Sequence, residues 1–86
     1  MWSVKFTKKA ADSLLDLDSD VQKRIRDKIS WLKDNFSNVN PESLSGELSH
    51  LNKLRVGDWR VLYKVDHDAQ ILWIVRVGHR SDIYEQ

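Results

Sequence analysis

Hydrophobic positions near the start of the chain first follow a period of two. Trp2, Val4 and Phe6 alternate with polar residues, which is typical of a short strand with one buried face. Over residues 8–17 the apolar positions instead recur at helical spacing and fall on one side of a helix. The pattern therefore predicts a strand followed by a short helix.

Polar residues that can cap a helix precede each predicted helix. Thr7 stands before the first, and Ser19 with Gln22 has the spacing of a capping box, in which each side chain bonds the backbone of the other residue. Apolar residues then recur every three or four positions through residues 21–36, as in a helix of about four turns. We expect the two helices to form a hairpin against one face of a sheet.

The second half of the chain returns to a period of two. Residues 37–50 contain the only proline and several Ser and Asn residues, which predicts a connection. Alternating runs at residues 51–56, 59–65 and 71–77, separated by turn-forming residues, predict three consecutive antiparallel strands. The expected fold is one α+β domain over residues 1–86, in the order β-α-α-β-β-β. Its small antiparallel sheet combines the N-terminal strand with a C-terminal three-stranded meander, and the helical hairpin packs on one face.

Composition is that of a small soluble domain with one core. The chain has 86 residues, of which 41% are hydrophobic and 31% charged. It has no cysteine, which excludes disulfides and thiolate metal sites and favours a reducing compartment. No apolar stretch approaches the length of a membrane span, and no leader pattern is visible. We expect a cytoplasmic protein with no membrane partner.

Basic residues of the predicted meander gather on one face. The net charge of +1 is too small to predict nucleic-acid binding by itself. However, Lys53, Arg55, Arg60 and Arg76 all alternate away from apolar neighbours and would share a sheet face. Such a face can hold the phosphates of single-stranded RNA. Solvated charges on an outer sheet face would give the same pattern, so both interpretations stay open.

Residues with possible chemistry follow the last predicted strand directly. His79 titrates near neutrality, and Arg80 beside it would favour the neutral ring. Tyr84 could stack on an unpaired base, whereas a histidine at a strand end is often only a hydrogen-bonded surface residue. His50 and His67 are weaker candidates. No metal-ligand set, glycine-rich phosphate loop or other cofactor motif is visible, so we expect neither a metal nor a cofactor.

Residues 53–66 and 71–84 together resemble the C-terminal half of RelE-type toxins of the RelE/ParE superfamily. The resemblance implies the order of strand, two helices and three strands over essentially the whole chain. It also implies a metal-independent endoribonuclease that cuts mRNA on the ribosome, with the ribose 2′-hydroxyl as nucleophile. A cognate antitoxin would hold this toxin inactive in a toxin–antitoxin hetero-oligomer.

The same resemblance implies roles for individual residues. Lys53, Arg60 and Arg80 match basic catalytic positions of RelE-like enzymes. Tyr84 matches the C-terminal aromatic residue that stacks on the substrate nucleotide or helps to activate it. The predicted catalytic set therefore contains these four residues and His79, and the predicted RNA-binding set contains Lys53, Arg60 and Arg80 with the two other arginines of the basic sheet face.

Leu51 departs from the family pattern, and two other functions are compatible with the same fold. Leu51 stands where RelE-like enzymes have a second lysine, so the proton-transfer roles are open to His79 or Tyr84. A ParE-like inhibitor of DNA gyrase would share the fold. A noncatalytic module that only binds an antitoxin would share it too.

Overall fold

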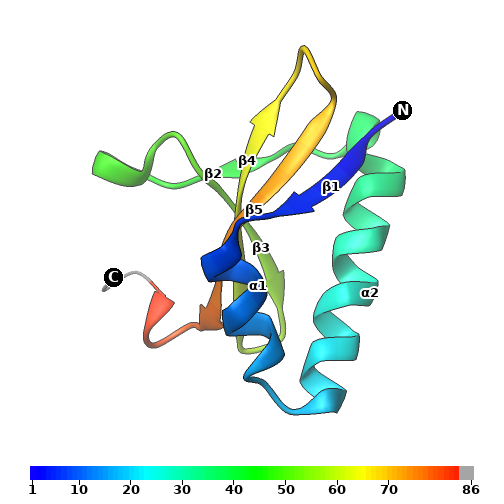
Figure 1. Ribbon diagram of the computed structural model, residues 1–86. Coiled ribbons are helices and arrows are strands. Elements are labelled where there is room, and N and C mark those ends of the chain that lie inside the picture. The colour runs from blue at the N-terminus through cyan, green and yellow to red at the C-terminus, as the bar shows by residue number, and fades with distance from the viewer. Residues whose placement is uncertain (84–86) are drawn as a thin grey trace.

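The core of the fold is a five-stranded sheet with the strand order β1-β5-β4-β3-β2 (Figure 1). The computed structural model of the chain describes residues 1–83. The predicted three-stranded meander is confirmed, because β4 pairs antiparallel with both β3 and β5. The strands are β1 (Ser3–Phe6), β2 (Glu42–Ser43), β3 (Asn52–Val56), β4 (Trp59–Asp66) and β5 (Ile71–His79).

The sheet is mixed, which corrects the prediction of a wholly antiparallel one. β1 runs parallel to β5. A tight turn forces antiparallel pairing only between strands that are consecutive along the chain, and both helices separate β1 from the meander. β2 was not predicted, because its two residues are too few to show a period; they pair with Asn52 and Lys53 of β3.

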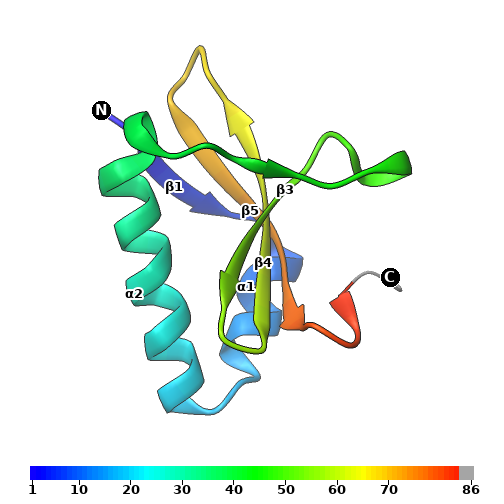
Figure 2. The ribbon, with the colours of Figure 1, turned by 180° about the vertical axis from the view of Figure 1, so that it is seen from behind.

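The two helices cover one face of this sheet (Figures 1 and 2). α1 spans Lys8–Leu15 and α2 spans Ser19–Asn35, and the predicted cap of α1 is confirmed, since the Thr7 hydroxyl accepts from the N–H of Ala10 at 3.2 Å. No helix among residues 1–83 combines the length and hydrophobicity needed to cross a bilayer. Buried residues of both helices meet inward residues of the strands in the main core, which contains Ala10, Leu14, Ile25, Ile29, Leu32, Phe36, Leu54, Val56, Val61, Tyr63, Leu72, Ile74 and Val77.

The predicted capping box at the start of α2 is wrong. Ser19 is already the first residue of the helix, and no side chain caps this end. The Gln22 amide instead donates to the carbonyl oxygens of Leu15 and Leu17, at 3.2 and 2.8 Å. The carbonyl of Leu15, the last residue of α1, has no partner within its helix, and neither bond of the Gln22 side chain goes to the start of α2.

A second, smaller apolar cluster lies on the face opposite the helices. It contains Leu51, Leu62 and Ile83, and Leu62 points away from the helices because its neighbours in β4 point into the main core. Pairing between β4 and β5 shifts beside Leu62, so that Val75 is passed over and Arg76 becomes its partner. Leu44 and Leu48 from the connection before β3 also pack there. Helices therefore cover one face, while short segments cover the other only in part.

Candidate functional site

The four basic strand residues lie on the face opposite the helices, called here the basic face: Lys53, Arg55, Arg60 and Arg76. Strand pairing arranges them in two rows across the sheet. In the first row the arginines of β3 and β4 pair with each other, and the β4 arginine pairs with Gly78. In the second row the other two basic residues flank Leu62. Rows on one face lie roughly 7 Å apart, so one stretch of phosphodiester backbone could contact both.

A carboxylate that the sequence analysis missed also lies on this face. Glu42 of β2 accepts from Arg55 Nη2 at 3.1 Å, and the same oxygen lies 3.4 Å from Lys53 Nζ. Its position could not be predicted because β2 itself was not. The two basic residues therefore share one anionic partner, and a substrate phosphate would have to compete with Glu42 for them.

The turn between β3 and β4 brings Arg60 and Arg80 to one place. Arg60 Nη1 donates to the carbonyl oxygens of Gly57 and Trp59, both at 2.8 Å. The backbone N–H of Arg80 donates to the carbonyl oxygen of Asp58 at 2.8 Å, and Arg80 Nε lies 3.6 Å from the Asp58 carboxylate. Carbonyl oxygens of three successive residues thus accept from the Arg60 side chain or from the Arg80 backbone. The Arg80 side chain is 63% exposed, so it can reach a ligand.

His79 does not join the basic face. It pairs with Trp59, whose side chain packs against the main core, and directly paired residues point to the same face. The two rings also meet edge to face, with centroids 5.4 Å apart. His79 Nδ1 lies 2.8 Å from the Ser81 hydroxyl oxygen and 3.2 Å from the backbone nitrogen of Ser81, so this ring nitrogen already has polar partners within the turn. The structure therefore places His79 on the helix side of the sheet, apart from the four basic strand residues.

Other predicted residues lie elsewhere or beyond the described part of the chain. His67 sits in the β4–β5 turn, at the opposite end of β4 from Arg60, where its ring meets that of Trp2 at 5.9 Å. Tyr84 falls outside residues 1–83. Leu51 is 5% exposed and packs in the second cluster, so its position has a packing role. Within residues 1–83 no group of three or more His, Asp or Glu residues is arranged to hold a metal ion.

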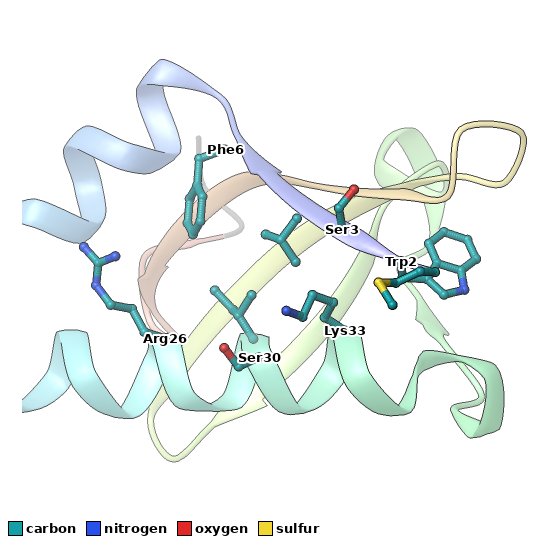
Figure 3. Close-up of a pocket in the computed structure, with 9 residues that line it drawn as sticks. Trp2, Ser3, Phe6, Arg26, Ser30 and Lys33 are labelled. Atoms are coloured by element: carbon teal, nitrogen blue, oxygen red, sulfur yellow. The ribbon is translucent and has the colours of Figure 1, made fainter.

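A groove of about 620 Å³ lies between β1 and α2, away from the basic face (Figure 3). Apolar side chains of Val4 and Phe6 line it from β1 and that of Trp2 from the residue before β1, and Arg26 and Lys33 line it from α2. None of the nine residues that line it is acidic. β1 is an edge strand, so one side of its backbone is not paired within the sheet. The sequence pattern identified the buried side of this strand but could not reveal the groove beside it.

Comparison with known proteins identifies the family. The family model for the "ParE toxin of type II toxin-antitoxin system, parDE" matches residues 4–84. A comparison with curated protein sequences found no match. The family match covers both helices, the sheet from the second residue of β1 onward, and the basic face.

Solved toxins share this fold. A chain of the RelBE2 toxin–antitoxin complex from Mycobacterium tuberculosis is 28% identical, with a TM-score of 0.81 over 92% of this chain and 98% of that one. The isolated RelE toxin of E. coli is 19% identical, with a TM-score of 0.78 over 99% and 93% of the two chains. A YoeB/ParE toxin from Agrobacterium tumefaciens is 20% identical, with a TM-score of 0.73 over 90% and 96%. The α+β fold is thus the fold of RelE-like toxins, and the chain belongs to the ParE toxin family of type II toxin–antitoxin systems, within the RelE/ParE superfamily.

Proposed function

We propose that this toxin is an endoribonuclease that cleaves mRNA on the ribosome. The observation that carries the proposal is that the β3–β4 turn binds both the Arg60 side chain and the Arg80 backbone, at the end of the basic face. Guanidinium groups bind phosphate oxygens through paired N–H donors. Two of them that extend from one turn could form a site for the negative charge that develops on a phosphate under attack.

The proposed reaction uses the RNA as its own nucleophile. The ribose 2′-oxygen forms a bond to the adjacent phosphorus, and the bond from phosphorus to the 5′-oxygen breaks. The 2′-hydroxyl proton passes to a base and the leaving 5′-oxygen takes a proton from an acid, so the products are a 2′,3′-cyclic phosphate and a 5′-hydroxyl. Because the nucleophile is internal, the protein has only to orient it, transfer protons and stabilise charge, and the proposal includes no metal or cofactor.

Residues of the basic face take different roles in this reaction. Arg60 and Arg80 stabilise the phosphorane, while Lys53, Arg55 and Arg76 bind flanking phosphates. Lys53 is also the candidate proton donor, since an ammonium group can protonate the leaving oxygen. Tyr84 retains the stacking or proton-transfer role that the family resemblance implies.

Ribosome dependence follows from the weak charge of the protein. The net charge is +1, and Glu42 and Asp58 already partner basic residues of the site. Affinity for free RNA by counterion release scales with the number of neutralised phosphates, so it should be low here. We propose that the ribosome holds the mRNA in place for the basic face, which locates the activity in the cytoplasm.

We also propose a cognate antitoxin as partner in a hetero-oligomer. The similar Mycobacterium tuberculosis chain was solved in a toxin–antitoxin complex. In this chain the β1–α2 groove offers a free strand edge, an apolar lining and the cations Arg26 and Lys33. An extended antitoxin segment could pair with β1, bury alternate apolar side chains in the groove and place a carboxylate beside the cations.

Gyrase inhibition is the second candidate function, because the matching family model carries the ParE name. Primer extension on one transcript, with and without its start codon, separates the two functions. The proposal predicts cuts only in the translated transcript and none with Arg80→Ala. Cutting of both transcripts would contradict ribosome dependence. Absence of cutting together with loss of gyrase supercoiling would favour the second function, and absence of both effects would favour a noncatalytic module.

A further inference from the structure

Ile83 is buried although it lies beyond the end of the last strand. Its exposed fraction is 1%, and β5 ends at His79. The side chain packs with Leu51 and Leu62 in the second apolar cluster, which lies on the basic face. The chain therefore leaves the sheet at His79 and returns to that face at Ile83.

Gly78 provides the space that Ile83 occupies. A Cβ atom at Gly78 would lie 3.1 Å from Ile83 Cδ1 and 3.8 Å from Ile83 Cβ. Gly78 pairs with Arg60, so its missing side chain would have projected from the basic face beside that arginine. Ile83 fills this place in the first row of the basic face.

The turn between these two residues is fixed at both ends. At its start the backbone N–H of Arg80 donates to Asp58, and within it the N–H of Asp82 donates to the carbonyl oxygen of His79 at 3.0 Å. At its end Ile83 is buried. Within residues 1–83 the Arg80 side chain forms an exposed ion pair with Asp58 at 3.6 Å, which restrains it weakly. The position of its guanidinium therefore depends on the backbone anchors.

We propose that Gly78 and Ile83 form a latch that fixes the turn over residues 79–83 and thereby positions Arg80 beside Arg60. Neither latch residue carries a polar side chain, so both act through the turn and not on the substrate. The proposed consequence for cleavage rests on the endoribonuclease function, whereas the contact and its effect on the turn do not.

Two single variants open the latch from opposite sides. Gly78→Val fills the space that Ile83 uses, and valine suits a strand, so β5 itself should tolerate it. Ile83→Ala removes the anchor. In the compensating pair Gly78→Ala with Ile83→Val, the isoleucine loses Cδ1, the atom that the new Cβ would approach at 3.1 Å. Val65→Ala is the matched control, because Val65 packs against the main core at the opposite end of β4.

Hydrogen exchange tests the latch without any assumption about activity. In Gly78→Val and Ile83→Ala, amides of residues 80–83 should exchange about tenfold faster or more, while Val65→Ala leaves them unchanged. The compensating pair should exchange like the wild type. Unchanged exchange in both single variants would overturn the latch, even if the wild-type protein proved not to cut RNA.

Single-turnover cleavage on ribosomes tests the positioning role, at a temperature where circular dichroism shows every variant folded. A misplacement of about 1 Å can cost about 10² in rate, so both single variants should lose at least about tenfold with ribosome binding unchanged. Gly78→Ala alone should lose rate because its Cβ meets Ile83, and adding Ile83→Val should recover most of that rate, which a general loss of stability would not produce. Faster exchange with a wild-type cleavage rate in the single variants would overturn the positioning role. A wild-type protein that cuts no RNA would instead refute the proposed function.

Discussion

Alanine substitutions at Arg60 and Arg80 should separate catalysis from stability within a single turn. Both residues offer a guanidinium to the proposed scissile phosphate. Arg60 also donates two hydrogen bonds of 2.8 Å to carbonyl oxygens of the β3–β4 turn. The side chain of Arg80 contacts the turn only through an exposed ion pair at 3.6 Å. Arg60→Ala should therefore affect both cleavage and folding, and Arg80→Ala should affect cleavage alone.

The size of each effect follows from these contacts. Hydrogen bonds from charged donors contribute about 1.5–3 kcal/mol each when buried, and Arg60 is only half-buried. We therefore expect Arg60→Ala to lower the free energy of unfolding by about 1–3 kcal/mol in total. The exposed Arg80 pair should contribute about 0–1 kcal/mol. For cleavage, loss of one preorganised charge contact should cost about 10² or more in either variant.

Urea unfolding and single-turnover cleavage measured on the same preparations test this reasoning. Arg60→Lys is the informative companion, because it keeps the charge but loses the planar fork. An Arg80→Ala protein that binds ribosomes and cuts at the wild-type rate would refute the proposed site. Equal unfolding midpoints for the two alanine variants would show that the carbonyl contacts of Arg60 contribute little to the turn.

Three further predictions concern other parts of the chain. Burial raises the pKa of Tyr63 from 10.0 to about 12, so the stability that its bound proton provides is complete below pH 10 and is lost between pH 10 and pH 12, about 2–3 kcal/mol in all. Urea titrations of Tyr63→Phe should show no such loss of stability above pH 10. If its free energy of unfolding fell with pH as in the wild type, burial of Tyr63 would not be the cause. Charge reversal at Arg26 and Lys33 in the β1–α2 groove should weaken antitoxin binding, measured by calorimetry, at least about tenfold. Charge reversal at the exposed Lys9 on α1 should leave the affinity unchanged. If the groove variant bound the antitoxin as tightly as the wild type, the groove would be excluded as the binding site. Tyr84→Phe should cleave normally if the ring only stacks and poorly if its hydroxyl moves a proton, and normal cleavage by Tyr84→Ala would exclude both roles.

Sequence periodicity was sufficient to predict the helices and strands that bury one face. The stripe of Ile25, Ile29 and Leu32 in α2 and the alternation of Val61 and Tyr63 in β4 both point into one core. Each pattern reflects a local requirement, namely that a half-buried element repeats its apolar side chains at its own period. The helical hairpin and the meander could therefore be predicted from sequence.

Features that depend on contacts between distant segments could not be predicted in this way. The parallel direction of β1 is set by its pairing with β5, and no local pattern encodes that choice. Gln22 fits a capping box by spacing, yet its amide bonds the end of the preceding helix. Glu42 has an ordinary loop context in the sequence, and only pairing of β2 with β3 brings it to Lys53 and Arg55.

The candidate site shows the same division. Alternation placed Lys53, Arg55 and Arg60 on one face, because side-chain direction in a strand follows position. His79 was included in the predicted catalytic set, but Gly78 is the residue that pairs with Arg60 on the basic face, and adjacent residues of a strand point to opposite faces. Pairing with Trp59 turns His79 toward the helix side. The family resemblance identified matching positions but not this orientation.

Leu51 connects the departure from the family to the geometry of the site. Its side chain is 5% exposed and packs with Ile83 and Leu62. A lysine in the same place would have to carry its charge out of an apolar contact, since an unpaired ammonium is costly to bury. Compared with the RelE-like pattern that the resemblance implies, this chain has one fewer cation here and one more apolar contact with Ile83. In the proposed latch the same contact holds the turn that carries Arg80, and on that basis we infer that this toxin relies less on the number of its basic groups than on how firmly the remaining ones are placed.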